Sequence, residues 1–380
     1  MKIAIVNSFY RRAVPSGENV AVQLQAEALR SAGHEVHMIS RETDELIDTP
    51  SYAIRSATRV ATGAGFSPLG AIKRINPDLV HAHNLFPNWS TNWVQRLDVP
   101  LVCTIHNFRS VCSAGTLMRN GAFCDLCPTS GSHHAVLNGC YQDSRLATIP
   151  LAIASRKNLI PPLFSASKAI IFPSERTRAL YDGYGLGFPE KASVIPHFTT
   201  PYENPPRDYK RHGFGSWAFV GRLSPEKGIT PLIRHWPSKV RLDVVGSGPE
   251  LLNCEREARG KEVYFHGQKS REEVQAILKA STGLLFPSVC SESAPSLVYL
   301  EALALGLPVI ALSGSSVADD VELAETGVTI STLGEVSEAL QIVDRKRDIF
   351  EEAARKRFSE RFTREVWVAN VERLYRRAMM

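Results

Sequence analysis

Two basic residues whose chemistry suits an anionic ligand lie five positions apart in the segment Gly221–Gly228. Arg222 and Lys227 follow an apolar run and precede a helical pattern, which places them on a loop. At the carboxyl edge of a parallel sheet, such a loop can bring a guanidinium and an ammonium onto one diphosphate, Arg as a bidentate fork and Lys as a point charge. Taken alone, the segment is also compatible with a solvated basic turn.

A second segment with ligand-binding chemistry runs from Phe286 to Pro308. Here a strand feeds a serine-rich loop and then a helix that Pro295 is placed to begin and Gly306 to end. Free N–H groups at the start of that helix make an anion site. Glu301 suits ribose hydroxyls and Glu292 suits sugar hydroxyls. A surface role for Glu301 is less favoured, because its surroundings are apolar and an unpartnered buried carboxylate is costly.

The elements that must position these loops alternate between apolar strands and helical patterns, which is typical of βαβ units and a parallel sheet. The first series of strands is expected at Ile3–Val6, Val36–Ile39, Leu79–His83, Leu101–His106, Ala169–Phe172 and Val194–Ile195. The second series is expected at Trp217–Gly221, Leu242–Gly246, Val263–Gly267, Leu284–Phe286 and Val309–Ala311. Ligands of doubly wound sheets bind beyond the carboxyl ends of strands, where both loops lie.

The division between the two series falls in the polar, proline-rich passage Pro201–Asp208. We therefore predict an N-terminal domain over residues 1–197, a linker over 198–214 and a C-terminal domain over 215–361. A cysteine-rich insertion occupies residues 110–145 of the first domain, and a terminal helix spans residues 362–380. Both domains are predicted to be α/β and Rossmann-like.

The composition is that of a soluble globular enzyme. Of 380 residues, 44% are hydrophobic and 22% are charged, which argues against a disordered, collagen-like or coiled-coil chain. The 44 Lys and Arg against 39 Asp and Glu give a net charge of +5. Residues 1–200 hold 19 basic and 14 acidic side chains and residues 201–380 hold 25 of each, so the surplus is wholly N-terminal. This basic surplus either binds an anionic lipid, a phosphorylated substrate or a nucleic acid, or it has no function.

No segment predicts export or a membrane span. The apolar run that begins at Ile3 is too short for a signal peptide, and the most apolar window, Leu297–Leu312, contains Glu301, Gly306 and Pro308. We expect a cytoplasmic protein, with the inner face of the membrane as the one place where it would contact lipid.

In order and spacing, a set of short motifs resembles glycosyltransferase family 4, the retaining nucleotide-sugar transferases of GT-B fold. The resemblance covers nearly the whole chain. Its motifs are Ser16-Gly17, Ala32–Val36, Pro77–His83, Thr104–His106, Ile170–Ser174, Val194–Pro196, Gly221–Leu223, Glu226–Gly228, Gly246–Pro249 and Glu292–Pro308.

The resemblance implies two Rossmann-like domains that face a cleft, with the terminal helix packed back on the N-terminal domain. The nucleotide-sugar donor would bind mainly to the C-terminal domain and the acceptor to the N-terminal one. Arg222 and Lys227 would hold the diphosphate without a metal ion, and Glu301 the ribose. The transferred sugar would contact Glu292 and the segment that contains Ser293, Ala294, Ser296 and Leu297.

Two further roles come from the same resemblance. Gly17 would let the N-terminal loop approach the donor phosphate, and His106 would be the active-site histidine beside the transferred sugar; a strand-end histidine bonded to backbone is the alternative. His81 and His83 point to one side of their strand, and we expect neither to touch ligand.

The spacing of the two glutamates departs from the family pattern, which has seven residues between them. Glu292 and Glu301 enclose eight, so strict spacing lands on Ser293. Either the loop carries one extra residue or Ser293 replaces the acid. We favour the insertion, since a loop absorbs a residue more readily than a helix does.

Four of the seven cysteines follow the pattern Cys-x11-Cys-x2-Cys-x12-Cys at Cys112, Cys124, Cys127 and Cys140. Their spacing suits a tetrahedral zinc ion, which would order a long polar loop. Disulfides, scattered thiols and an iron–sulfur cluster are the alternatives. The position after Thr104–His106 suggests that the insertion shapes the acceptor pocket.

Other classes of function are disfavoured by particular features. A zinc-containing nucleic-acid-binding module would need more basic and aromatic residues than the insertion holds. A catalytically silent sugar-nucleotide-binding protein stays open because of the displaced Glu292. A GT-B phosphorylase would need a lysine for pyridoxal phosphate, and no site for one is apparent.

The donor base, the sugar and the acceptor remain open. A lipid-linked or otherwise anionic acceptor is our leading hypothesis, and cell-envelope polysaccharide or glycoconjugate synthesis is the expected pathway.

Overall fold

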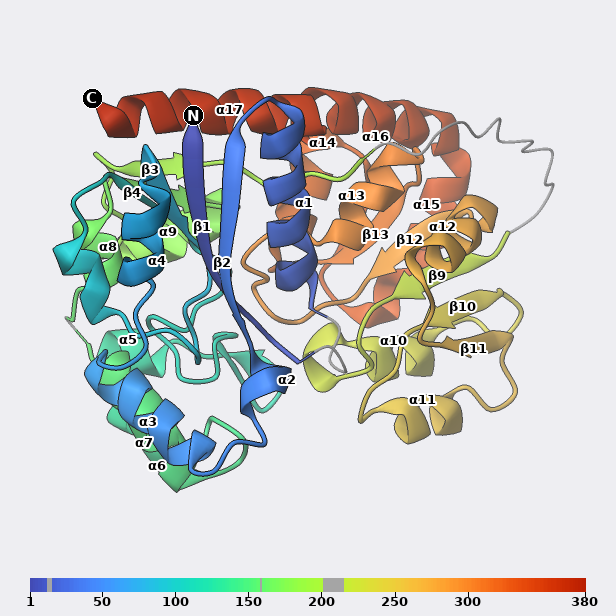
Figure 1. The fold of residues 1–380 in the computed structure, drawn as a ribbon. Helices are drawn as coiled ribbons and strands as arrows, with labels where there is room; N and C mark the ends of the chain where they lie inside the picture. Colours follow the sequence, from blue (N-terminus) through green and yellow to red (C-terminus); the bar gives the residue numbers. More distant parts are fainter. Residues whose placement is uncertain (12–15, 158, 201–214) are drawn as a thin grey trace. The chain divides into compact units, whose positions relative to one another are not determined.

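A computed structural model describes residues 1–11, 16–157, 159–200 and 215–380, so most of the predicted linker lies outside the described residues. The chain divides into two compact units (Figure 1). Unit 1 comprises Met1–Arg119, Cys124–His197 and Trp367–Met380. Unit 2 comprises Asn120–Phe123 and Phe198–Val366.

Unit 1 is built on a six-stranded parallel sheet in the order β2-β1-β3-β4-β7-β8. The strand order reverses between β1 and β3, which is where doubly wound sheets open a crevice for ligands. Its strands are β1 (Lys2–Phe9), β2 (Glu35–Glu42), β3 (Leu79–Ala82), β4 (Leu101–Thr104), β7 (Ala169–Phe172) and β8 (Ala192–Val194). β3 and β4 are buried throughout, as parallel strands covered on both faces must be.

The helical segments of unit 1 before its last helix are α1 (Gly17–Ser31), α2 (Thr43–Leu46), α3 (Tyr52–Thr62), α4 (Leu69–Ile75), η1 (Asn92–Arg96), α5 (Leu126–Ser130), α6 (His133–Leu137), α7 (Arg145–Ala154), α8 (Pro162–Ala166) and α9 (Glu175–Gly183). Of these helices, α1, α8 and α9 pack on this sheet, whereas α3, α6 and α7 pack on one another. The short strands β5 (Met118–Arg119) and β6 (Ala122–Phe123) lie between β4 and α5. The Ser16 hydroxyl caps α1 by accepting from the N–H of Asn19.

The last helix, α17 (Arg364–Met379), contributes its residues from Trp367 onward to unit 1. Its buried face carries Trp367, Val371 and Leu374, the three apolar positions at helical spacing. Glu372 accepts a hydrogen bond from the His34 ring at 2.9 Å. A terminal helix is therefore integrated into unit 1 by packing and by polar contacts.

Unit 2 has a second six-stranded parallel sheet, in the order β11-β10-β9-β12-β13-β14. This is the Rossmann order, with the reversal between β9 and β12. The strands are β9 (Trp217–Val220), β10 (Leu242–Val245), β11 (Val263–Gly267), β12 (Gly283–Phe286), β13 (Val309–Leu312) and β14 (Gly327–Ile330). The last strand was not predicted, because its sequence Gly-Val-Thr-Ile is a short and weakly apolar run that no ligand motif follows.

The helical segments of unit 2 are η2 (Pro225–Lys227), α10 (Ile229–His235), α11 (Leu251–Glu257), α12 (Arg271–Ala280), α13 (Leu297–Ala304), α14 (Ser316–Ala324), η3 (Leu333–Glu335), α15 (Val336–Arg345) and α16 (Arg347–Arg361). One prediction about them is wrong. Pro295 does not begin α13, because the extended Ser296 is its N-cap and the helix begins at Leu297. Gly306 follows the C-cap with φ of 67°, as expected of a helix stop.

Candidate functional site

Two loops meet at the switch point of unit 2, and we call them the loop pair: Gly221–Gly228 after β9 and Pro287–Ser296 after β12. The N–H of Val289 donates to the carbonyl of Glu226 at 3.0 Å. Gly228 has φ of 67°, and a Cβ there would lie 2.1 Å from the carbonyl oxygen of Pro287. The contact therefore requires glycine, for its conformation and for its lack of a side chain.

The loop pair brings Lys227 and Glu292 into a direct ion pair, with side chains 26% and 15% exposed. Burial alone would lower the pKa of Lys227, but the Glu292 carboxylate more than offsets it and holds that pKa above its ordinary value. Glu292 has φ of 36°, which a residue with a side chain rarely adopts. The backbone is thus strained at the residue that turns its carboxylate toward the lysine.

Arg222 stands at the start of the loop pair with its side chain half exposed. Its Nη2 lies 3.7 Å from Oε1 of Glu226, and the Ser224 hydroxyl donates to the same oxygen at 2.6 Å. A third loop supports this one, since the N–H of Leu223 donates to the carbonyl of Ser247 at 2.9 Å. The Arg222 guanidinium is therefore exposed to solvent on a loop that hydrogen bonds hold in place.

Glu301 lies on α13, and its side chain is 10% exposed. Its carboxylate accepts from Nε of Arg271 at 3.2 Å, and Nη2 of Arg271 donates to the Thr199 hydroxyl at 2.8 Å. The predicted buried carboxylate thus has a cation partner, which the sequence motifs did not include. The predicted segment from Ser293 to Leu297 leads into α13, whose cap Ser296 accepts from the N–H of Tyr299 at 3.3 Å.

His106 follows β4 in unit 1 and belongs to a group of buried imidazoles. Nδ1 of His83 and Nε2 of His106 are 2.9 Å apart, and the His106 ring stacks on His197 at 5.2 Å between centroids. Burial lowers the pKa of His83 and of His106 well below the ordinary value, and the neighbouring rings lower it further. Both rings are therefore neutral near pH 7, and one of the two facing nitrogens donates to the other.

His81 differs from His83, although their rings are only 4.1 Å apart. The Nδ1 of His81 contacts the hydroxyl of Tyr375 at 2.7 Å, and Nε2 contacts the hydroxyl of Thr104 at 2.8 Å. Both nitrogens are thus used within the core. By contrast, Nε2 of His83 is buried without a hydrogen-bond partner among the described residues, and His83 lines a pocket.

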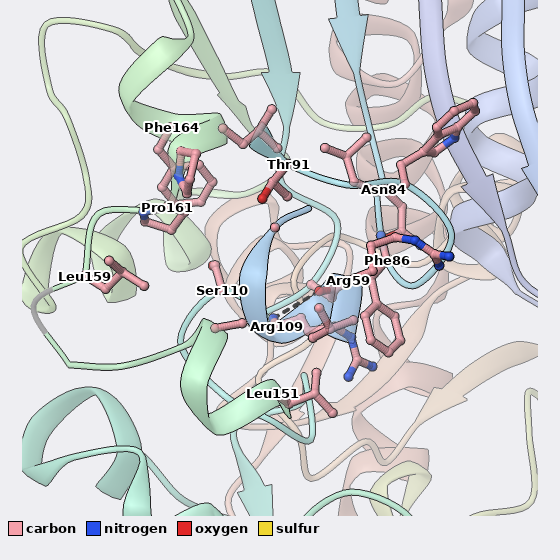
Figure 2. A pocket seen from close by; sticks show the side chains of 18 of the residues that line it. Arg59, Asn84, Phe86, Thr91, Arg109, Ser110, Leu151, Leu159, Pro161 and Phe164 are labelled. Carbon is pink, nitrogen blue, oxygen red and sulfur yellow. Dashed lines mark hydrogen bonds between the residues drawn. The ribbon is translucent and has the colours of Figure 1, made fainter. Parts of the chain in front are cut away.

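That pocket, which we call the unit 1 pocket, has a volume of about 340 Å³ and follows the carboxyl ends of β3 and β4. Figure 2 shows Leu159, Pro161 and Phe164 along one side and Asn84 and Phe86 along another. The charged side chains that line it are those of Glu18, Arg59, Arg109 and Arg156. It therefore combines an apolar wall with a mainly basic set of polar groups.

Glu18 is the acid of the unit 1 pocket and was missed by sequence reasoning. One carboxylate oxygen accepts from the Asn107 side chain at 3.2 Å, and the other is buried without a partner among the described residues. Burial raises the pKa of Glu18 to about 7, against the opposing influence of Asn107 and Arg109. Its neighbour Gly17, which was predicted, is the first residue of α1, and a Cβ built on it would have no atom of the described residues within 4 Å. Its place directly after the Ser16-Gly17 motif was the one feature of the sequence that could have marked Glu18 as a site residue.

The four cysteines of the insertion lie near one another as free thiols. Burial raises the pKa of Cys127 to about 12, and the thiols of Cys112, Cys140 and Cys124 add to that rise. In the described parts of the chain, no three or more His, Cys, Asp or Glu side chains are arranged to hold a metal ion. The arrangement is thus a cluster of thiols, and a zinc ion in it stays a prediction.

None of the helices within the described ranges combines the length and the apolar character that a membrane span requires.

Comparison with known families gives two matches that follow each other along the chain. Residues 15–201 match the model of Glycosyltransferase Family 4. Residues 216–345 match the model of Glycosyl transferases group 1. No curated protein sequence gives a significant match.

Solved structures resemble the chain over almost its whole length. Sucrose-phosphate synthase from Thermosynechococcus elongatus is 19% identical, with 99% of this chain and 98% of that chain covered and a TM-score of 0.68. WaaG, a glycosyltransferase involved in lipopolysaccharide biosynthesis, is 17% identical, with coverages of 98% and 99% and a TM-score of 0.65. HepE of Anabaena in complex with UDP-glucose is 15% identical, with 98% of each chain covered and a TM-score of 0.61. The predicted fold is confirmed, and the chain belongs to the glycosyltransferases of the family 4 type with GT-B fold.

Proposed function

We propose that the chain is a retaining glycosyltransferase that moves a hexosyl or related sugar from a nucleoside diphosphate to a glycan, lipid-linked or other acceptor. The family matches support glycosyl transfer. A structure of HepE was obtained with UDP-glucose, and WaaG is involved in lipopolysaccharide biosynthesis. By analogy, we place the reaction in the synthesis of cell-envelope polysaccharide or a glycoconjugate.

The observation that carries the proposal is the pairing of Lys227 with Glu292 at the switch point of unit 2. In a nucleotide sugar, the distal phosphate and the sugar hydroxyls are only a few bonds apart. A cation and a carboxylate held side by side match those two chemistries, with Lys227 for the diphosphate and Glu292 for the hydroxyls. The pairing also favours Glu292 over Ser293 as the sugar contact.

The other donor contacts follow from position. Arg222 would bind the diphosphate through its exposed guanidinium, and Glu301 would bind the ribose with its carboxylate held by the hydrogen bond from Arg271. Ser293, Ala294, Ser296 and Leu297 would contact the sugar and phosphate from the start of α13. Gly17 would leave room for the donor phosphate beside α1.

Chemically, the leaving nucleoside diphosphate gains negative charge as the glycosidic bond breaks. Fixed positive groups at Arg222 and Lys227 stabilise that charge, so the proposed reaction needs no metal ion. His106, kept neutral by burial, would contact the transferred sugar by hydrogen bonding. The unit 1 pocket would hold the acceptor, whose hydroxyl or phosphate oxygen attacks the anomeric carbon as the bond to the diphosphate breaks.

The acceptor side is proposed from charge. The surplus of basic residues lies in residues 1–200, which contain the unit 1 pocket. We propose a cytoplasmic enzyme that meets a lipid-linked acceptor at the inner face of the membrane, where anionic lipids attract a basic surface. Failure to bind anionic vesicles at low salt would argue for a soluble acceptor instead.

For the insertion, we propose a structural zinc ion held by Cys112, Cys124, Cys127 and Cys140. Four thiols gathered in one segment are a suitable donor set, and zinc would bind them as thiolates. Metal analysis of protein purified without added zinc is expected to give about one equivalent per chain. Protein without zinc would contradict the proposal.

The proposed function is tested by a thermal-shift panel of nucleoside diphosphates and their sugars, followed by turnover. A donor that binds only the folded chain raises the melting temperature. We expect one nucleotide family to stabilise the protein, sugar release or transfer to follow, and NMR of the product to show retained anomeric configuration. Binding without hydrolysis or transfer would instead favour a silent binding protein.

A further inference from the structure

Three arginines converge on one aromatic ring in unit 1. Arg41 lies near the end of β2, and Arg55 and Arg59 lie on α3. Their guanidinium carbons are 3.8, 5.4 and 5.1 Å from the centroid of the Phe66 ring, respectively. An aromatic face attracts one cation, but three around the same ring repel one another.

Glu45 offsets part of the charge of Arg41, whereas the charge of Arg59 is poorly compensated. Arg59 is 5% exposed, its Nη1 donates to the carbonyl of Pro87 at 2.7 Å, and its Nε is buried without an acceptor among the residues that the structure describes. Within the part of the chain that the structure describes, no carboxylate forms an ion pair with Arg59. Burial lowers the pKa of Arg59, and the charges of Arg41 and Arg55 lower it further. A buried guanidinium without a carboxylate partner is energetically costly, and a bound anion would reduce that cost.

Arg59 also lines the unit 1 pocket, so the cluster has an opening toward a ligand. A fourth arginine, Arg109, lines the same pocket, with its guanidinium carbon 4.3 Å from the centroid of the Phe86 ring. Its Nη1 donates to the carbonyl of Ser113 at 3.0 Å, and its Nε is buried without a partner in the described part of the chain. Against these cations, Glu18 is the one acidic residue among the described residues that line the pocket. The balance of charge therefore favours an anionic occupant.

We propose that the unit 1 pocket binds a phosphate-bearing acceptor, with Arg59 and Arg109 as the groups that contact the phosphate. Their guanidinium groups match phosphate oxygens in charge and geometry. The apolar wall around Leu159 and Phe164 contacts the remainder of the acceptor. This inference rests on the proposed function, because it names the class of acceptor that the transferase uses.

The test is a calorimetric titration of the full chain with the donor site filled by a saturating nucleoside diphosphate, so that added phosphate cannot bind to Arg222 and Lys227. Glycerol 1-phosphate is the soluble probe, and an isoprenyl monophosphate in phosphatidylcholine vesicles is the lipid probe. Glycerol and plain phosphatidylcholine vesicles are the uncharged counterparts. We expect saturable binding of at least one phosphate probe and none of its uncharged counterpart.

Three variants of the pocket arginines and one control distinguish binding in the pocket from attraction to the general positive charge of the unit. Arg59→Gln and, independently, Arg109→Gln are expected to weaken phosphate binding at least tenfold, and Arg59→Lys to weaken it less. Arg96→Gln, which removes an exposed arginine of the same unit, is the matched control and should leave binding unchanged. A normal shift of melting temperature with nucleotide shows that each variant is folded.

The outcomes are distinct. Binding of glycerol 1-phosphate assigns a soluble acceptor, and binding of the isoprenyl phosphate alone assigns a lipid-linked one. Equal affinity in the wild type and both glutamine variants, or no phosphate binding by the wild type, would overturn the inference. A chain that binds phosphate through Arg59 but binds no nucleotide would contradict only the proposed function.

Discussion

The loop pair of unit 2 and the unit 1 pocket differ in whether their buried charged and polar groups have partners. In unit 2, Lys227 is paired with Glu292 and Arg271 with Glu301. In unit 1, Arg59, Glu18 and His83 each keep a buried polar atom without a partner among the described residues. Paired charges hold a loop in shape before a ligand arrives, whereas unpaired buried groups cost stability that a ligand can restore.

This difference teaches where each kind of site can be recognised. The loop pair depends on charges that lie close in sequence to glycine and proline, so it leaves motifs. The unit 1 pocket is assembled from α1, α3 and the loops after β3 and β4; His83 and His106 lie in the motifs Pro77–His83 and Thr104–His106, but Arg59 and Arg109 lie in no motif. The predictions below test whether the paired region serves chemistry and the unpaired region serves acceptor binding.

The largest effect is expected for Arg222→Ala. The side chain is 51% exposed, so its removal should leave the melting temperature nearly unchanged. Turnover should fall by roughly 10²-fold or more, as when one preorganised charge-stabilising group is lost. Steady-state kinetics with the donor found in the thermal-shift panel would measure it. Normal turnover in the folded variant would contradict the assignment of Arg222 to the diphosphate.

The second prediction concerns the Lys227–Glu292 ion pair, tested by a double-mutant cycle of Lys227→Met and Glu292→Gln. Because both side chains are largely buried, each single change should leave the remaining side chain buried without its ion-pair partner. The coupling energy measured by urea unfolding should be about 1–3 kcal/mol. Each change should also slow turnover.

The matched control for that cycle is the more exposed pair of Arg234 and Glu257, with side chains 60% and 23% exposed. Its coupling should stay below about 1 kcal/mol, as is usual for surface pairs. Additive effects at Lys227 and Glu292 would show that the two do not act as a unit.

Much of the fold could be predicted because buried parallel strands are short apolar runs that stop at glycine, proline or a polar residue. β7 was predicted residue for residue at Ala169–Phe172, while β14 was missed, since Gly327–Ile330 is less apolar and only Ile330 of it is fully buried. The start of α13 was misplaced by two residues, because a serine cap and a nearby proline both mark helix starts.

The candidate site could be predicted only in part. Arg222, Lys227, Glu292 and Glu301 lie in local motifs, and the structure brings Lys227 to Glu292. The partner of Glu301, Arg271, lies 30 residues away in sequence and no spacing rule links the two. Arg59 and Arg109 were missed for the same reason, since a pocket assembled from distant segments depends on tertiary packing.

The third prediction uses the pH dependence of Glu18. Because its pKa is raised from 4.5 to about 7 in the folded chain, the folded state holds the proton more tightly than the unfolded state does. Stability should therefore fall as pH rises from about 4.5 through 7, by up to roughly 3 kcal/mol, and then level off.

Glu18→Gln should remove this loss, so the variant should be more stable than the wild type at pH 8 and similar at pH 5. Urea unfolding at the two pH values measures the change. Glu27→Gln, on the exposed side of the same helix, is the matched control and should track the wild type. An unchanged pH profile in Glu18→Gln would show that this carboxyl ionises normally.

The smallest effect is expected for Tyr375→Phe on α17, which removes the hydroxyl that contacts Nδ1 of His81. Losing one buried hydrogen bond should cost about 1 kcal/mol of stability. Turnover should not change, because both nitrogens of His81 are used inside the core and its ring does not line the pocket. A fall in turnover without a fall in stability would instead place His81 in the active site together with His83 and His106. His81 would then have to be counted as a residue of the site and not of the core.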